Sequence, residues 1–132
     1  MSHFQLDFVG IGAAKAGTTW LAACLSEHPQ VCISDKKELN YFCTHDVWRK
    51  NMLYSERNLR WLQDRFTHHQ AGQLRGEFSP NYLLDPTTPQ RLWQHRCDLK
   101  LLISLRNPVD ALYSYYYELR RRWRVPATFE AF

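Results

Sequence analysis

The chain has 132 residues, a length typical of one domain, and its 45% apolar and 14% aromatic residues are enough for a packed core. The formal net charge of +4 and the pI of about 9.0 favour anionic ligands, but an excess of this size does not by itself indicate nucleic-acid binding. The sequence contains no internal repeat, low-complexity stretch or linker, which argues against a repeat protein or a disordered chain.

Four apolar runs predict strands, at 4–12, 31–33, 75–78 and 99–105. The first and last are almost continuously apolar, as is typical of strands buried on both faces. A helical pattern follows each strand. This alternation predicts an α/β fold with a central parallel sheet between two layers of helices.

Apolar spacing and capping residues predict helices at 19–27, 46–66, 87–97 and 107–123. The second should consist of two pieces, with Ser55 capping the second piece, and in the third Thr87 or Thr88 should be the cap. The last helix should bury an apolar stripe formed by Val109, Leu112, Tyr113, Tyr116 and Leu119. Residues 128–132 resemble the opening of a further helix.

The cysteines, Cys24, Cys32, Cys43 and Cys97, form no C-x-x-C pair and have no zinc-site spacing. Cys24 on the first helix and Cys32 in an apolar run are expected to be buried thiols. No signal peptide or membrane span precedes the first loop. We therefore expect a reduced, cytoplasmic protein.

The stretch Phe8 to Leu25 reads as a strand, a tight loop and a helix start. At a helix N-terminus the first N–H groups have no intrahelical partner and can bind a phosphate, aided by the helix dipole. Gly17 would let the backbone approach an anion closely, while Thr18 and Thr19 supply hydroxyl donors and Lys15 a charge. A Walker A loop has lysine directly after its second glycine, where this chain has Thr18. The alternative is a solvated lysine on an ordinary turn.

A second anion site is predicted where the last strand ends, at Arg106. Ligands of open α/β sheets bind outside the carboxyl ends of the strands, so Arg106 should lie on the same sheet edge as the first loop. Ser114 would sit about 9 Å up the following helix, at 1.5 Å per residue. An arginine and a hydroxyl could thus close on one phosphate. Alternatively, Arg106 pairs with Asp110 and Ser114 bonds back to a helix carbonyl.

These two motifs resemble those of the sulfotransferases, which use 3′-phosphoadenosine 5′-phosphosulfate (PAPS). Residues 12–21, GAAKAGTTWL, resemble the family's 5′-phosphosulfate loop, and residues 106–116, RNPVDALYSYY, resemble its 3′-phosphate segment with the same interval of eight between Arg106 and Ser114. The resemblance implies a three-layer α/β/α fold like that of P-loop nucleotide kinases. It also implies that PAPS is bound by the residues Lys15, Ala16, Gly17, Thr18, Thr19, Trp20, Arg106 and Ser114. Trp20 would stack on adenine; otherwise it would be a core residue.

Two further stretches resemble the branch of heparan-sulfate-type and bacterial sulfotransferases. Residues 37–42, KELNYF, resemble the segment whose glutamate is the proposed catalytic base, which implies Glu38 as base beside Lys15, with Tyr41 and Phe42 shielding it. The alternative for Glu38 is a surface charge. Residues 76–83, GEFSPNYL, resemble a G-E-K-[ST]-P-x-Y segment in which Phe78 replaces lysine, a departure that argues against an acidic polysaccharide acceptor.

Several roles and partners follow as expectations. Glu77 could orient Lys15, bind acceptor or pair with Arg75. We expect a small-molecule or glycan acceptor, no metal requirement, and neither nucleic acid nor membrane as a partner. The basic residues Arg120, Arg121, Arg122 and Arg124 suit a helix C-terminus.

The resemblance implies that residues 1–132 are one sulfotransferase domain, incomplete at its C-terminus because family domains are about twice as long. Two other functions compete with sulfuryl transfer. One is an ATP-dependent P-loop kinase, against which the displaced lysine and the absence of an acidic residue in 99–105 both argue. The other is a non-catalytic nucleotide-binding module.

Overall fold

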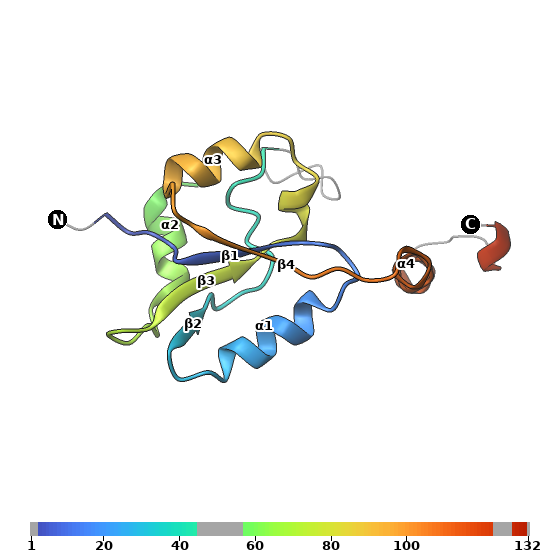
Figure 1. Cartoon of the computed structure of the whole chain (residues 1–132), viewed down its shortest axis with the longest axis horizontal. Coiled ribbons are helices and arrows are strands. Elements are labelled where there is room, and N and C mark those ends of the chain that lie inside the picture. Colours follow the sequence, from blue (N-terminus) through green and yellow to red (C-terminus); the bar gives the residue numbers. More distant parts are fainter. Residues whose placement is uncertain (1–2, 45–56, 123–127, 132) are drawn as a thin grey trace.

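The computed structural model describes residues 3–44, 57–122 and 128–131. Its centre is a four-stranded parallel sheet with the strand order β2-β3-β1-β4 (Figure 1). The strands are β1 (Phe8–Gly12), β2 (Val31–Ile33), β3 (Leu74–Phe78) and β4 (Lys100–Ile103). The predicted parallel sheet is therefore confirmed, although the first and last strands are shorter than the apolar runs that predicted them.

The helices follow the strands in the predicted order. They are α1 (Thr18–Ser26), α2 (Leu59–Gln63), α3 (Thr88–His95) and α4 (Pro108–Arg122), with 3₁₀ turns η2 (Asp64–Phe66), η3 (Pro80–Leu83) and η4 (Phe129–Ala131). The predicted cap Ser55 lies outside the described residues. Asn58 caps α2 instead, because its side chain accepts a hydrogen bond from the Trp61 N–H at 3.0 Å.

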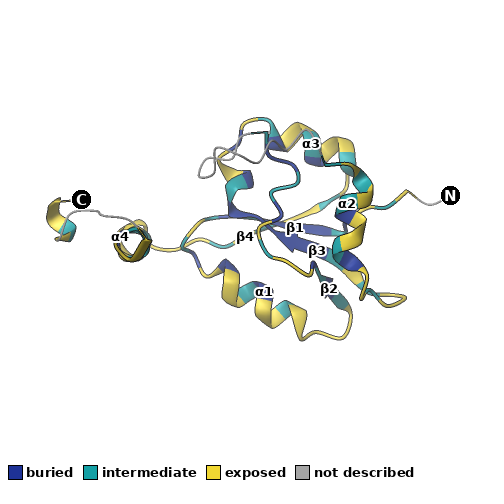
Figure 2. Ribbon diagram, turned by 180° about the vertical axis from the view of Figure 1, so that it is seen from behind, coloured by how far each residue is buried: buried dark blue, intermediate teal, exposed yellow. Residues whose placement is uncertain are grey.

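The sheet separates two apolar clusters. On one face Ala22 of α1 packs in a cluster with Phe8 and Phe78 of the sheet. On the other face α2, η2 and α3 enclose a larger core that includes Val9 and Leu62. Figure 2 shows the buried residues concentrated in the sheet and on the inward sides of these helices, as a three-layer α/β/α arrangement requires.

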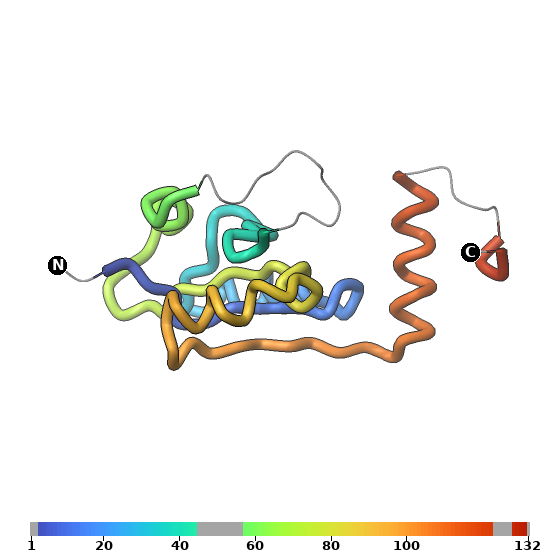
Figure 3. The backbone as a smooth tube through the Cα atoms, turned by 90° about the horizontal axis from the view of Figure 1, so that it is seen from above, coloured from blue at the N-terminus to red at the C-terminus, as the bar shows by residue number. Residues whose placement is uncertain are grey.

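The C-terminal part of the chain is more exposed than its apolar pattern predicts. Leu101, Ile103 and Leu105 are 50%, 52% and 79% exposed, because β4 is an edge strand that pairs only with β1 among the described strands. Along α4 only Tyr116 is buried, whereas Val109 is 65% exposed. The predicted buried stripe is thus confirmed at Tyr116 alone, and the reason is that α4 stands clear of the sheet (Figure 3).

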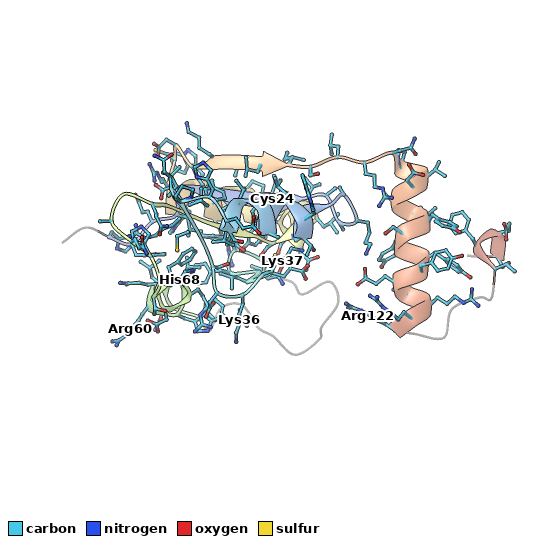
Figure 4. The ribbon with its side chains drawn as sticks, turned by 90° about the horizontal axis from the view of Figure 1, so that it is seen from below. Cys24, Lys36, Lys37, Arg60, His68 and Arg122 are labelled. Carbon is cyan, nitrogen blue, oxygen red and sulfur yellow. The ribbon has the colours of Figure 1, made fainter. Side chains whose placement is uncertain are left out.

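The four cysteines, all within the described residues, form no disulfide, and burial separates them into two pairs. Cys32 and Cys43 are buried, whereas Cys24 and Cys97 are exposed. The prediction that Cys24 is buried is wrong, because this residue lies on the outer side of α1 (Figure 4). Within the described part of the chain, no helix combines the length and the apolar character that crossing a bilayer requires.

Candidate functional site

The loop between β1 and α1 is anchored to the end of β4. The Ala13 N–H donates to the Ser104 carbonyl at 2.8 Å, and the Ser104 N–H donates to the Gly12 carbonyl at the same distance. The Ser104 hydroxyl also donates to the Ala16 carbonyl, deeper in the loop. Ser104 therefore positions the loop, a role that sequence reasoning missed because its partners lie about ninety residues earlier in the chain.

Gly17 is the N-cap residue that precedes α1 and has the left-handed conformation, with φ of 81°. No side chain caps the helix, and no atom lies within 4 Å of the place where a Cβ on Gly17 would stand. The first intrahelical bond runs from the Leu21 N–H to the Gly17 carbonyl at 3.0 Å. The N–H groups that precede Leu21 on α1 are thus left for another acceptor, which makes this helix end suitable for an anion.

The two threonines at this helix end differ in exposure. Thr18 is buried, whereas Thr19 is exposed. Ala16 is buried in the loop beneath them. Trp20 is 72% exposed, which excludes the alternative of a core tryptophan and leaves its ring free to stack on a ligand.

Lys15 has a positive φ of 61° and extends its side chain toward α4. Its ammonium group forms a salt bridge with Glu118, which also pairs with Arg122 at 3.0 Å. The hydrogen bond from Lys15 is the main reason that the pKa of Glu118 is lowered. Lys15 thus connects the loop to α4, a contact that the sequence pattern did not indicate.

Arg106 lies directly beside this loop. Its guanidinium donates a hydrogen bond to the Lys15 carbonyl at 3.3 Å, and the side chain remains exposed. The structure therefore brings the two predicted anion sites together at one edge of the sheet. Ser114 is half-buried on α4, and in the part of the chain that the structure describes no hydrogen bond joins it to Arg106.

Glu38 is held at the same edge, where the chain runs past the end of β3. Its N–H donates to the Phe78 carbonyl at 2.8 Å, and its backbone has a positive φ of 62°. Its side chain is 53% exposed and pairs with Lys37 at 3.2 Å. The expected shielding by Tyr41 and Phe42 is not seen, because Tyr41 stacks on Trp61 and Phe42 is buried in the core.

Glu77 is the one fully buried carboxylate among the described residues. Its Oε2 accepts a hydrogen bond from the Ser79 hydroxyl at 2.8 Å, and this hydroxyl accepts one from the Asn40 N–H at 2.9 Å. Burial raises the pKa of Glu77 to about 7, against the opposing effects of Tyr82 and Ser79. Glu77 thus holds the Glu38 segment in place.

The three expected roles of Glu77 find no support, since no hydrogen bond between described residues joins it to Lys15 or Arg75, and its burial keeps it from an acceptor. The positively charged Arg75 side chain instead contacts His69 and the ring of Phe4. Among the described residues, no three His, Cys, Asp or Glu side chains are arranged to hold a metal ion.

Comparisons with known proteins agree with this arrangement. The Sulfotransferase domain family matches residues 6–132. A sulfotransferase from Alicyclobacillus acidocaldarius has a solved structure similar to this chain, with a TM-score of 0.82 and 33% identity, covering 96% of this chain and 55% of that one.

Two curated relatives show the same similarity at the level of sequence. The membrane-associated sulfotransferase kil1 of Dictyostelium discoideum is 33% identical over 114 residues, which are 84% of this chain and 22% of kil1. The heparan sulfate glucosamine 3-O-sulfotransferase 5 of Mus musculus is 27% identical over 83% of this chain and 29% of its own length. This chain spans less than a third of each of these relatives. With a family match over nearly its whole length and a close structural neighbour, the chain belongs to the sulfotransferase family.

Proposed function

We propose that this chain binds PAPS and, as part of a sulfotransferase, transfers the sulfuryl group to a hydroxyl or amine acceptor. The observation that carries the proposal is the hydrogen bond from Arg106 to the Lys15 carbonyl. It joins the open helix end of α1 and the arginine after β4 into one basic site, which suits a ligand with two phosphate-like ends. Family membership supports the same donor.

In this reaction the bond between sulfur and the 5′-phosphate oxygen breaks and leaves 3′-phosphoadenosine 5′-phosphate (PAP). A new bond forms between sulfur and the acceptor oxygen or nitrogen, and the acceptor proton passes to the Glu38 carboxylate. Lys15 and the free N–H groups at the start of α1 would neutralise the charge that develops on the 5′-phosphate. The exposed Glu38 carboxylate is open to an incoming acceptor.

We further propose that Trp20 stacks on adenine, that Ser114 with Arg106 binds the 3′-phosphate, and that no metal is needed. The exposure of Trp20 and the proximity of Arg106 to the loop support the first two assignments. The acceptor would be a small molecule or a glycan, in keeping with the relatives' names, one of which is a heparan sulfate 3-O-sulfotransferase. A cytoplasmic location is proposed because the four cysteines, all within the described residues, form no disulfide.

Calorimetry with PAP, with ATP and with each of these plus Mg²⁺ tests the proposal against its two rivals. We expect PAP to bind without metal and ATP to bind more weakly. Preference for ATP with Mg²⁺ would indicate a kinase. PAP binding without sulfuryl transfer from PAPS to any acceptor in a mass-spectrometric screen would indicate a binding module. Absence of PAP binding would refute the site altogether.

A further inference from the structure

Lys37 lies outside both phosphate-binding motifs, but its ammonium group reaches the start of α1. Its Nζ donates a hydrogen bond to the Thr19 hydroxyl at 2.8 Å and pairs with the Glu38 carboxylate at 3.2 Å. Thr19 belongs to the first turn of α1, beside the N–H groups that lack an intrahelical acceptor. A lysine eighteen residues away in sequence thus adds a positive charge to the anion site.

The segment that carries Lys37 is anchored along the carboxyl end of β3. The Ser34 N–H donates to the Gly76 carbonyl at 3.1 Å, and the Glu38 N–H donates to the Phe78 carbonyl at 2.8 Å. The Lys37 side chain is 27% exposed, whereas its neighbour Lys36 is exposed. Figure 4 shows Lys37 on the side of α1 and Lys36 pointing away from it. Lys37 is therefore held toward the loop.

Three cations then surround the loop from different directions. Lys15 extends toward α4, where it pairs with Glu118, and Arg106 lies at the end of β4. Lys37 lies at the first turn of α1, beside the exposed carboxylate of Glu38. The last residue of β3, Phe78, is an apolar side chain buried in the core, and it supplies no cation at this end of the strand. Lys37 is thus the cation next to the proposed base.

We propose that Lys37 binds the sulfuryl oxygens of the donor, while Lys15 and the α1 N–H groups bind the adjoining 5′-phosphate. This inference rests on the proposed function. The sulfuryl group carries its own negative charge, and the acceptor attacks it from the side of the base. A lysine that pairs with the base therefore lies where it can contact the sulfuryl group of the donor. Lys37 neither gives nor takes a proton in this step, so its contribution is charge neutralisation.

The comparison of PAPS with PAP isolates this contact, because the two ligands differ only in the sulfuryl group. Calorimetry would give both dissociation constants for the wild-type chain, for Lys37→Ala, for Lys37→Arg and for the adjacent control Lys36→Ala. We expect Lys37→Ala to weaken PAPS binding about tenfold or more and to change PAP binding by less than about threefold. Lys37→Arg should retain most of the PAPS affinity, and Lys36→Ala should change neither constant.

The outcomes separate this inference from the proposed function. Equal weakening of PAPS and PAP in Lys37→Ala, or unchanged PAPS affinity, would overturn the sulfuryl contact while the proposed function stands. Lower turnover of Lys37→Ala with unchanged PAPS affinity would show that Lys37 only positions Glu38. This result would also overturn the sulfuryl contact. If the wild-type chain binds neither ligand, the proposed function fails and this inference fails with it.

Discussion

Lys15 is the residue on which the proposed donor site depends most directly. Its backbone φ of 61° is uncommon for a residue with a side chain, and its salt bridge with Glu118 directs the ammonium toward α4. Because a preorganised donor at a developing charge typically contributes a factor of about 10²–10³ in rate, Lys15→Ala should lower sulfuryl-transfer turnover by about that factor. Steady-state kinetics with PAPS and an acceptor found by screening would measure this loss.

Lys36→Ala is the matched control, since Lys36 is an exposed lysine away from the loop. It should leave turnover within about twofold of wild type, because an exposed charge contributes little. Near-normal turnover of Lys15→Ala would contradict its assigned role. An equal loss in both variants would point to a general effect of net charge.

Glu77 makes stability depend on pH in a direction opposite to that of most carboxylates. Its pKa is raised from an ordinary value of 4.5 to about 7, so the folded protein keeps a proton that the unfolded chain releases. The contribution of Glu77 to the free energy of unfolding is fully present below about pH 4.5. As the pH rises to about 7 this contribution, roughly 3 kcal/mol, is lost. Glu77→Gln should remove this dependence, as thermal unfolding between pH 4.5 and 8 would show.

His95 must be separated from Glu77 in this experiment. Burial lowers the pKa of His95 to about 4, so this group makes stability fall as the pH drops below its ordinary value of 6.5. In the wild-type chain the two groups change the free energy of unfolding with pH in opposite directions. The quantity to compare is therefore the difference in stability between wild type and Glu77→Gln at each pH. The exposed Glu27→Gln variant is the control and should follow the wild-type curve. A Glu77→Gln curve parallel to wild type would contradict the buried, protonated carboxyl.

At the scale of elements, β1 and β3 pack through glycines opposite aromatic rings. A Cβ on Gly10 would stand 2.0 Å from the Phe78 ring, and one on Gly76 would stand 2.1 Å from the Phe8 ring. The glycines thus leave room for two phenylalanine rings, which meet edge to face in the cluster under α1. Gly10→Ala should destabilise the protein by about 1–3 kcal/mol through overpacking, as urea unfolding would measure.

A double-mutant cycle makes this prediction specific. Phe78→Leu removes the ring atoms that a Cβ on Gly10 would meet. Gly10→Ala should therefore cost less in the Phe78→Leu background, with a coupling energy of about 0.5–3 kcal/mol. Additive effects of the two substitutions would show that Gly10 is needed for backbone reasons alone.

The α4 helix contributes to the site although little of its surface is buried. Its first turn follows Arg106, and farther along it Glu118 reaches back to Lys15. Figure 3 shows the helix standing apart from the sheet. The salt bridge between Glu118 and Lys15 therefore joins α4 to the loop between β1 and α1. Arg122 extends this ion-pair network on α4, while Trp123 and Arg124 lie outside the described residues.

At the scale of the whole molecule, one ligand should stabilise both sides of the site. If PAP joins α1 to the start of α4, it should slow amide hydrogen exchange in residues 13–21 and in residues 106–114 together. By mass action, PAP at about 100 times its dissociation constant should add about 2.7 kcal/mol to the free energy of unfolding. Hydrogen-exchange mass spectrometry with and without PAP would test this joint protection.

Arg106→Ala separates the two segments. This variant should keep part of the protection at 13–21 and lose it at 106–114, with PAP affinity reduced about tenfold or more, because a guanidinium–phosphate contact is charge-assisted. Asp110→Asn is the control, since the exposed Asp110 lies one turn from Arg106 and is not its partner. Protection confined to one segment of the wild-type chain would contradict a single shared site.

Much of the fold could be predicted because its signals are local. The apolar run before Gly12, the glycine at the start of α1 and the apolar face of Leu59, Leu62 and Phe66 all correspond to observed elements. The strand at 31–33 was predicted with its exact bounds. Burial was predicted less well, because the apolar patterns of β4 and α4 do not reveal that most of their apolar side chains, Tyr116 excepted, stay exposed in the described chain.

The sequence by itself determined the order of strands and helices, the loop between β1 and α1 and the identity of its charged residues, since these depend on propensity and spacing over a few residues. The tertiary structure decided which of those residues meet. Arg106 contacts a residue ninety-one positions earlier, Lys37 reaches Thr19, and Ser79 joins Glu77 to the backbone of the Glu38 segment. Such contacts arise only when parallel strands bring their carboxyl ends to one edge, and pattern alone does not specify which side chains converge there.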